Sequence, residues 1–438
     1  MSAKHALLCF LWLMGSMALA GPKIEHWPTS KGAKVYYVYS PELPMVDVRV
    51  TLAAGSAFDG EKSGLATLTS MLLDKGAGEW DADAIARRLE DVGARLETGT
   101  ARDSSWLHLR SLTDPDKLEQ ALITVGQILA SPRFAEEDFV REKQRLLLAL
   151  QRQEESPDQI AQKLFFKAIY GRHPYAQPIE GEIEAVKTIT REDLVDFHRR
   201  FYVARNSWIV IVGALERGRA AQVAERLTAD LAEGESAPPL PDVQEGEDNQ
   251  VVRRSFPSAQ THVLTGMPAL ARGDPEYFPL YVGNHVLGGG GFTSRLVQEV
   301  REKRGLSYSV ASYFLPLKQE GPFLASLQTR NDQAEAALEV LNRVIRAYLD
   351  EGPSDKELTA AKKNLTGGFV LNYDSNAKLA DYLATIAFYD LPLDWLDAFP
   401  KRVEAVTRQQ VIRAFRRLNP DRFRTVLVGG SSKADEQK

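Results

Sequence analysis

The sequence predicts an α+β protein with two homologous halves, each an antiparallel β-sheet with helices packed on one face. Three observations support this class. Segments with strand-like alternation are interspersed with long amphipathic segments of helical period. The order of these segments recurs once along the chain. The 438 residues are enough for large cores, and the single cysteine, Cys9, leaves the fold without internal disulfides.

Residues 1–20 have the pattern of a secretory signal peptide. A charged start precedes an apolar run, and small residues ending at Ala20 form an A-x-A cleavage site before Gly21. The apolar run is too short for a confident transmembrane helix, so we expect no membrane span after cleavage. An exported chain without cysteines is expected in the periplasm of a Gram-negative bacterium.

The first half, residues 21–234, contains both kinds of pattern. Segment 35–56 is apolar with turn residues inside it and predicts a β-hairpin, while 95–112 predicts further strands. A last strand is expected at 207–214. The predicted helices cover residues 64–76, 82–92, 116–130, 136–153 and 191–201.

Two pairs of segments carry the internal repeat. Residues 188–215 match 404–430, and residues 118–147 resemble 334–366. In the second pair, a long amphipathic helix ends in a Pro-containing turn and a charged helix follows. Two pairs in the same order at nearly the same offset are not expected by chance, so the chain is predicted to contain two related domains.

An acidic, Pro-rich stretch separates the halves. It predicts an exposed linker at 235–250, with the second domain at 251–438. The net charge is −5, and charges of both signs are dispersed along the chain. Without a basic block, the chain is not expected to bind nucleic acid or an anionic membrane surface.

The helix at 64–76, GLATLTSMLLDKG, has a leucine stripe that should face the core. Thr67, Ser70 and Met71 lie on the neighbouring face, at the spacing by which a helix holds two metal ligands and a general base. A hydroxyl and a thioether are poor zinc ligands, and Ser70 cannot act as a base near neutral pH without a base of its own. The sequence also contains no H-E-x-x-H or H-x-x-E-H motif.

A glycine run, Gly288, Gly289, Gly290 and Gly291, precedes a predicted helix with Ser294 as its N-cap. Such a run lets the backbone approach another group closely, and an extended peptide is one such group. An anion-binding nest is the other reading, although the lysine of a phosphate-binding loop is absent. We predict that these glycines form a substrate-binding loop.

The next segment continues from this helix into a predicted strand at 306–314. Arg301 lies in the last helical turn, where cations interact favourably with the helix dipole, and Gly305 ends the helix. Alternation places Tyr308 on the same side of the strand as Val310. From the pattern alone, Arg301 is a surface charge and Tyr308 a half-buried strand residue.

Together these segments resemble the pitrilysin/insulinase family of zinc metallopeptidases over nearly the whole mature chain. GLATLTSMLLDKGA aligns without a gap with the family's GLAHFLEHMLFKGT, and SRLVQEVREKRGLSYSV is similar to its SRLFQELREKRGLAYSV. By this resemblance, Thr67 and Met71 stand at the two histidine positions, Ser70 at the catalytic glutamate and Leu148 at the third ligand. All four have lost that chemistry, so we expect this chain to bind no zinc.

The resemblance also implies roles for Arg301 and Tyr308, which have the family's R-x6-Y spacing. Tyr308 would donate a hydrogen bond to the scissile carbonyl, and Arg301 would hold the substrate backbone. The family includes two-subunit peptidases in which one chain brings zinc and the other brings Arg and Tyr. We therefore expect the non-catalytic subunit of a periplasmic heterodimeric zinc metallopeptidase, with a zinc-bearing partner and a peptide substrate. The alternative is a peptide-binding or scaffold protein of this fold without peptidase activity.

Overall fold

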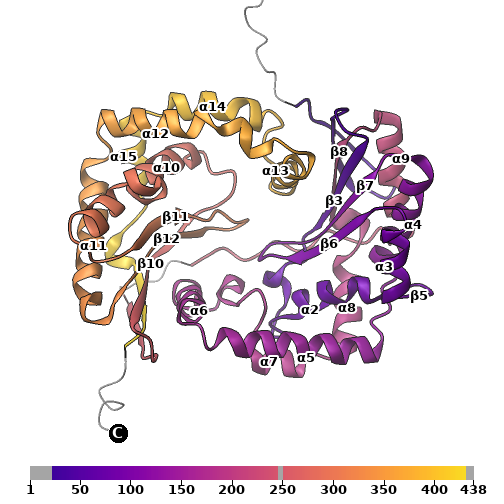
Figure 1. The fold of residues 1–438 in the computed structure, drawn as a ribbon, viewed down its shortest axis with the longest axis horizontal. Helices are drawn as coiled ribbons and strands as arrows, with labels where there is room; N and C mark the ends of the chain where they lie inside the picture. The colour runs from indigo at the N-terminus through magenta and orange to yellow at the C-terminus, as the bar shows by residue number, and fades with distance from the viewer. Residues whose placement is uncertain (1–21, 245–249, 431–438) are drawn as a thin grey trace, which may run out of the picture.

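The computed structural model describes residues 22–244 and 250–430 (Figure 1). The predicted signal peptide, residues 1–20, lies outside the described residues. Each half contains one large sheet, with strand order β1-β2-β8-β3-β7-β6 in the first and β11-β12-β10-β13-β9 in the second. The predicted α+β class is confirmed.

Long-range pairing builds both sheets. The first contains β1 (Glu25–Pro28), β2 (Lys34–Tyr39), β3 (Met45–Leu52), β6 (Arg95–Thr100), β7 (Ser105–Leu112) and β8 (Ser207–Gly213). The second contains β9 (Gln250–Arg254), β10 (Gln260–Leu270), β11 (Ser309–Phe314), β12 (Gly321–Arg330) and β13 (Arg424–Val428).

Helices surround the two sheets. Those of the first half are α2 (Leu65–Leu72), α3 (Ala82–Glu90), α4 (Pro115–Ala130), α5 (Glu136–Gln153), α6 (Pro157–Tyr170), α7 (Ile183–Thr188), α8 (Arg191–Phe201) and α9 (Arg217–Thr228). Those of the second are α10 (Tyr277–Asn284), α11 (Ala334–Glu351), α12 (Asp355–Gly367), α13 (Asn376–Phe388), α14 (Trp395–Ala405) and α15 (Arg408–Phe415). The five helices predicted in the first half are confirmed, with small differences at their ends.

The predicted hairpin at 35–56 is wrong. Strands β2 and β3 do not pair with each other, because β8 lies between them, parallel to β2 and antiparallel to β3. In the second sheet, β9 likewise pairs in parallel with β13. Both sheets are therefore mixed, with one parallel pair each, and the local pattern around residue 40 could not reveal a strand that arrives much later in the chain.

The two halves share helix caps and glycine positions as well as helices and strands. The side chains of Thr190 and Thr407 cap α8 and α15, each within a capping box. Strands β8 and β13 then lead to Gly213 and Gly429, with φ of 154° and 151°. A Cβ at these positions would lie 2.3 and 2.5 Å from a backbone oxygen of the neighbouring strand, so both positions require glycine.

Each sheet is covered on its second face by a helix from the other half. Helix α13 packs on β3 and β8 of the first sheet, and α6 packs on β10 and β13 of the second (Figure 1). Val210 of β8 belongs to the same core as Leu383 of α13, and Phe165 of α6 to the same core as Val426 of β13. The prediction of helices on one face therefore described only half of the packing.

A buried carboxylate joins the two halves. Asp103 of the first half accepts hydrogen bonds from the hydroxyls of Tyr175 and Tyr389 and, at 2.9 Å, from the backbone N–H of Lys318. Lys318 lies in the loop between β11 and β12, and Tyr389 directly follows α13. This one side chain therefore fixes two parts of the second half against the first.

The linker and domain boundaries stay predictions. Residues 235–244 are mostly exposed, but the chain there is anchored to both halves. The backbone oxygen of Leu240 accepts from Gln319 Nε2 at 3.0 Å, and that of Pro241 lies 2.9 Å from His173 Nε2. Among the helices of the described ranges, none is long and apolar enough to cross a bilayer.

The Asp103 network predicts a large effect of one substitution on stability. Asp103→Ala should lower the free energy of unfolding by about 3 kcal/mol, because it leaves buried hydroxyl and N–H donors without an acceptor. Urea unfolding followed by circular dichroism measures the change. Asp242→Ala, at an exposed position in the linker, is the matched control and should be neutral. Equal stability of the two variants would contradict the role of the network.

Candidate functional site: a degenerate metal helix and an exposed aromatic stack

Helix α2 is held firmly at its first turn. Gly64 precedes it with φ of 99°, and the carboxylate of Asp59 accepts from the backbone N–H groups of Gly64 and Ala66 at 2.7 and 2.8 Å. Burial raises the pKa of Asp59 to about 7, while these backbone hydrogen bonds favour its charged form. The helix is thus positioned by its neighbours and needs no metal to fix its start.

The four positions that correspond to the family's metal site have ordinary structural surroundings. Thr67 Oγ1 donates to the backbone oxygen of Ile179 at 2.7 Å, and Met71 is half-buried against the core of the first half. Ser70 is buried, and its hydroxyl has no hydrogen-bond partner among the described residues. Leu148 lies on α5 with 56% of its surface exposed.

These residues do not fit zinc. Zinc sites in proteins use imidazole, thiolate or carboxylate, and Thr67, Met71 and Leu148 offer none of them. The hydroxyl of Ser70 is enclosed without a base that could accept its proton. Across 22–244 and 250–430, no group of three or more His, Cys, Asp or Glu side chains is arranged to hold a metal ion.

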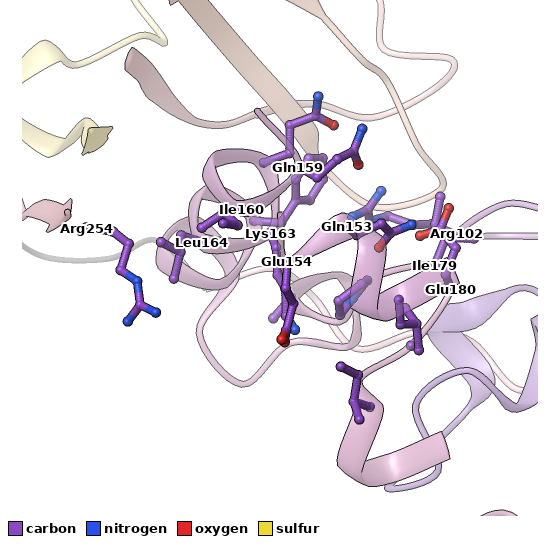
Figure 2. A pocket seen from close by; sticks show the side chains of 17 residues that line it. Arg102, Gln153, Glu154, Gln159, Ile160, Lys163, Leu164, Ile179, Glu180 and Arg254 are labelled. Atoms are coloured by element: carbon purple, nitrogen blue, oxygen red, sulfur yellow. The ribbon is translucent and has the colours of Figure 1, made fainter. Parts of the chain in front are cut away.

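A cavity of about 420 Å³ lies between α6 and the loop that contacts α2. Ile179, which accepts the hydrogen bond from Thr67, is part of its wall. Figure 2 shows Gln159 and Lys163 of α6 on one side of it and Arg102 and Glu180 on the other. A ligand-sized cleft with both apolar and charged walls therefore lies next to the loop that contacts Thr67.

Arg102 is the residue in this cleft that sequence reasoning missed. Its guanidinium lies 3.6 Å from the centre of the Phe166 ring, and its Nε donates to the backbone oxygen of Tyr175 at 3.3 Å. Burial lowers its pKa to about 10, so it remains charged at neutral pH. No motif marks this arginine, because its partners come from helices and loops distant in sequence.

Arg301 and Tyr308 lie in contact, which the spacing alone did not predict. The guanidinium carbon of Arg301 lies 4.5 Å from the centre of the Tyr308 ring and 4.8 Å from that of Phe292. Arg301 is thus stacked between two aromatic rings, and Phe292 was not predicted as a member of the group. We call these three residues the aromatic stack.

Two details of this region differ from the expectation. Tyr308 is 82% exposed and precedes β11, so it is not a half-buried strand residue. Ser294 is not a side-chain N-cap, because its hydroxyl donates to the backbone oxygen of Gly291 at 2.8 Å. The helix that follows contains a π-helical segment, Val297–Glu302, which carries Arg301. The altered winding sets the direction of Arg301 and could not be read from the hydrophobic pattern.

The glycine run has a partly internal role. A Cβ on Gly288 would lie 2.4 and 2.5 Å from Oγ and N of Ser312, so this backbone packs directly against strand β11. Gly291 has φ of 60° and open space around its Cβ position. The run thus combines a packed start with an open end beside the aromatic stack; its contact with substrate stays a prediction.

The metal positions and the aromatic stack lie in different halves. Helix α2 belongs to the first half and β11 to the second (Figure 1). In the described part of the chain, no hydrogen bond, ion pair or ring contact joins Thr67, Ser70, Met71 or Leu148 to Arg301 or Tyr308.

The sequence and the fold both match a known family. Residues 34–182 match the family model described as insulinase (peptidase family M16), and residues 188–365 match that described as peptidase M16 inactive domain. A solved structure of a peptidase M16 inactive domain from Pseudomonas fluorescens is 37% identical, with 94% of this chain and 98% of that chain covered and a TM-score of 0.90.

More distant relatives agree. An uncharacterized zinc protease of Mycobacterium leprae is 27% identical over 404 residues, which covers 91% of this chain and 90% of that protein. A protease from Helicobacter pylori has the same fold, with a TM-score of 0.86 at 19% identity. The match covers 93% of this chain and 100% of that chain. Fold and site together define a non-catalytic protein of the M16 type. The chain belongs to peptidase family M16, the insulinase family.

Restoring the lost side chains should restore a metal site. A variant with Thr67→His, Ser70→Glu, Met71→His and Leu148→Glu should bind about one zinc ion per chain, because α2 and α5 still pack together and three donors complete a zinc site. The unchanged chain should bind none. Plasma mass spectrometry of dialysed protein measures both. The control variant carries the other three substitutions but keeps Leu148, and it should bind zinc much more weakly. A well-folded fourfold variant free of zinc would contradict this reading of the four positions.

The pair of Arg295 and Glu357 predicts an acid-sensitive anchor for the segment that carries Arg301. Arg295 donates two hydrogen bonds of 2.8 Å to this carboxylate, which lowers its pKa from 4.5 to about 2. The pair therefore stabilises the fold above about pH 4.5, and this contribution is lost as the pH falls towards 2. Glu357→Gln should cost about 1–2 kcal/mol at pH 7 and remove this slope.

Urea unfolding at several pH values between 2 and 7 tests the anchor. Glu339→Gln, at an exposed position on α11, serves as the control. Parallel stability profiles for wild type and Glu357→Gln below pH 4.5 would rule out the assigned contribution.

Proposed function

We propose that this chain is the non-catalytic subunit of a heterodimeric M16 zinc peptidase. It supplies Arg301 and Tyr308 to the active site of a zinc-bearing partner, which cleaves peptides held between the two chains. The observation that carries the proposal is the contrast between the halves: the four metal positions have no ligand chemistry, while the Arg and Tyr positions are kept and presented at the surface.

The aromatic stack supports this role. Phe292 and Tyr308 are 67% and 82% exposed, and the Tyr308 hydroxyl has no partner among the described residues. A free, fixed phenol is suited to donate a hydrogen bond to the oxygen of a scissile carbonyl as negative charge develops there. Arg301 is oriented by the two rings, and its Nε lies 3.4 Å from the carboxylate of Glu302; its terminal N–H groups remain for backbone oxygens of the peptide.

Peptide binding by strand addition fits the two sheets. Strands β6 and β11 are at the edges of their sheets, β6 beside α2 and β11 beside the glycine run. An extended peptide that pairs with such an edge gains affinity from main-chain hydrogen bonds and shows little sequence preference. The proposal places the complex in the periplasm, on the basis of the leader-like pattern of residues 1–20.

Mixing experiments test the proposal. The purified mature chain is combined with the most similar H-x-x-E-H protein from the same genome, and cleavage of a quenched fluorescent peptide is followed. The mixture should exceed the activity of that protein alone at least tenfold. Tyr308→Phe should lower the turnover of the mixture by about 100-fold, because it removes one oxyanion donor.

The elution volume of the complex in gel filtration should not change with Tyr308→Phe. Tyr39→Phe, at an exposed position outside the stack, is the control and should be fully active. If the Tyr308→Phe variant and the Arg301→Gln variant each keep full turnover, the roles assigned to the two residues are wrong. Absence of any effect of mixing would favour the alternative, a peptide-binding or scaffold protein.

A further inference from the structure

Arg272 lies where three cavities of the second half meet. It follows β10 and lines cavities of about 300, 280 and 470 Å³. The walls come from α10, β11 and α13, and the third cavity extends to β3 and β7 of the first half. A single guanidinium therefore faces most of the internal space between α13 and the second sheet.

This guanidinium has no acidic partner. Among residues 22–244 and 250–430, it forms no ion pair and no hydrogen bond, and its Nε is buried without an acceptor. Its recorded contact is the ring of Tyr389, 5.3 Å away. The nearby carboxylates of Asp274 and Glu276 are engaged by Arg417, at 2.8 and 2.7 Å.

The two smaller cavities are aromatic and free of acidic side chains in their described walls. Tyr277 and Tyr281 line both, with nearly parallel rings whose centres lie 5.7 Å apart, and Tyr382 lines the second. None of these three phenols has a recorded hydrogen-bond partner in the described chain, and none is sealed in the protein interior. Unused N–H and O–H donors thus converge on a space with positive charge, which suits a carboxylate attached to an apolar group.

The first of these cavities reaches the surface where a peptide is proposed to bind. Its wall includes Gly289 of the glycine run and Tyr313 of β11, which is 46% exposed. The cavity thus leads from the edge strand to Arg272. A chain that lies along β11 can place one end or one side chain against the guanidinium.

We propose that Arg272 anchors a carboxylate-binding site for peptides, with the carboxylate supplied by the C-terminus or by an acidic side chain. The step from carboxylate to peptide rests on the proposed function. The guanidinium takes the carboxylate through two parallel hydrogen bonds, and the tyrosines hold the adjacent apolar group. The site gives this subunit a share in substrate selection that does not depend on the aromatic stack.

Fluorescence anisotropy with matched peptides tests the site. Fluorescein-labelled AVSVAF is prepared as the free acid and as the C-terminal amide, and the amidated pair AVSVEF and AVSVQF reports on a side-chain carboxylate. We expect the acidic member of at least one pair to bind at least tenfold more tightly than its neutral counterpart. Whichever pair shows the difference identifies the source of the carboxylate.

The difference should vanish in Arg272→Gln and shrink in Arg272→Lys, which keeps the charge but not the two-pronged geometry. Arg416→Gln, at an exposed position on the same half, makes the same change in net charge and should retain it. Circular dichroism confirms that each variant is folded. Equal binding of acidic and neutral peptides to the wild type, or an undiminished difference in Arg272→Gln, overturns the site.

A small probe separates this site from the peptide role. 3-Phenylpropionate at millimolar concentration should raise the melting temperature of the wild type but not of Arg272→Gln, and its amide should have no effect. Stabilisation by the acid without binding of any peptide would uphold the carboxylate site and overturn its peptide role. Peptide binding that ignores charge, without stabilisation by the acid, would overturn the site and leave the proposed function intact.

Discussion

The exchange of helices between the halves is the constraint on which this fold depends. The central strands β8 and β13 bury apolar side chains on both faces, Ile209 and Val210 in β8 and Val426 and Leu427 in β13, and such strands need a cover on each side. Each half provides helices for one face of its own sheet, and the other face is covered by α6 or α13 from the opposite half. Val210 and Phe165 would be exposed if the halves separated. The two halves are therefore homologous in sequence and structure but form one packing unit.

This interlock fixes the space in which ligands are expected. Because α13 lies against the first sheet, Thr385 and Tyr389 form one side of the cavities around Arg272. Asp103 then ties Tyr389 and the β11–β12 loop to the first half. The edge strand β11 is thus held by the neighbouring helices and by the loop that follows it. A rigid edge of this kind is a good template for an added strand, since little backbone freedom is lost on binding.

The packing of α2 does not depend on metal chemistry, for a simple geometric reason. The leucines that bury this helix lie on one face, and Thr67, Ser70 and Met71 lie on the next. Substitution on the second face removed the ligands without opening the core. Asp59, which fixes the first turn from outside the helix, is also independent of any metal. Fold and catalysis occupy separate faces of one helix, so one could be lost while the other stayed.

The sequence predicted what depends on short-range patterns. Helices α5 and α8 were placed to the residue, because apolar periodicity and capping residues are local signals. It failed where distant segments decide: β8 inserts between β2 and β3, and helices α6 and α13 cross to the other half. It also could not indicate Arg102 or Arg272, since the residues that surround each arginine come from segments distant in sequence.

The second half carries features that lower the stability of the chain on its own. The aromatic rings of Phe292 and Tyr308 are exposed, and the buried Nε of Arg272 lacks an acceptor. All three border the same region, the glycine run and strand β11. These features do not stabilise the chain itself, and they lie around one edge strand. A bound peptide at that edge accounts for them. The glycine run and β11 are therefore the surface to which we assign the proposed peptide, while the packing of α2 serves the fold.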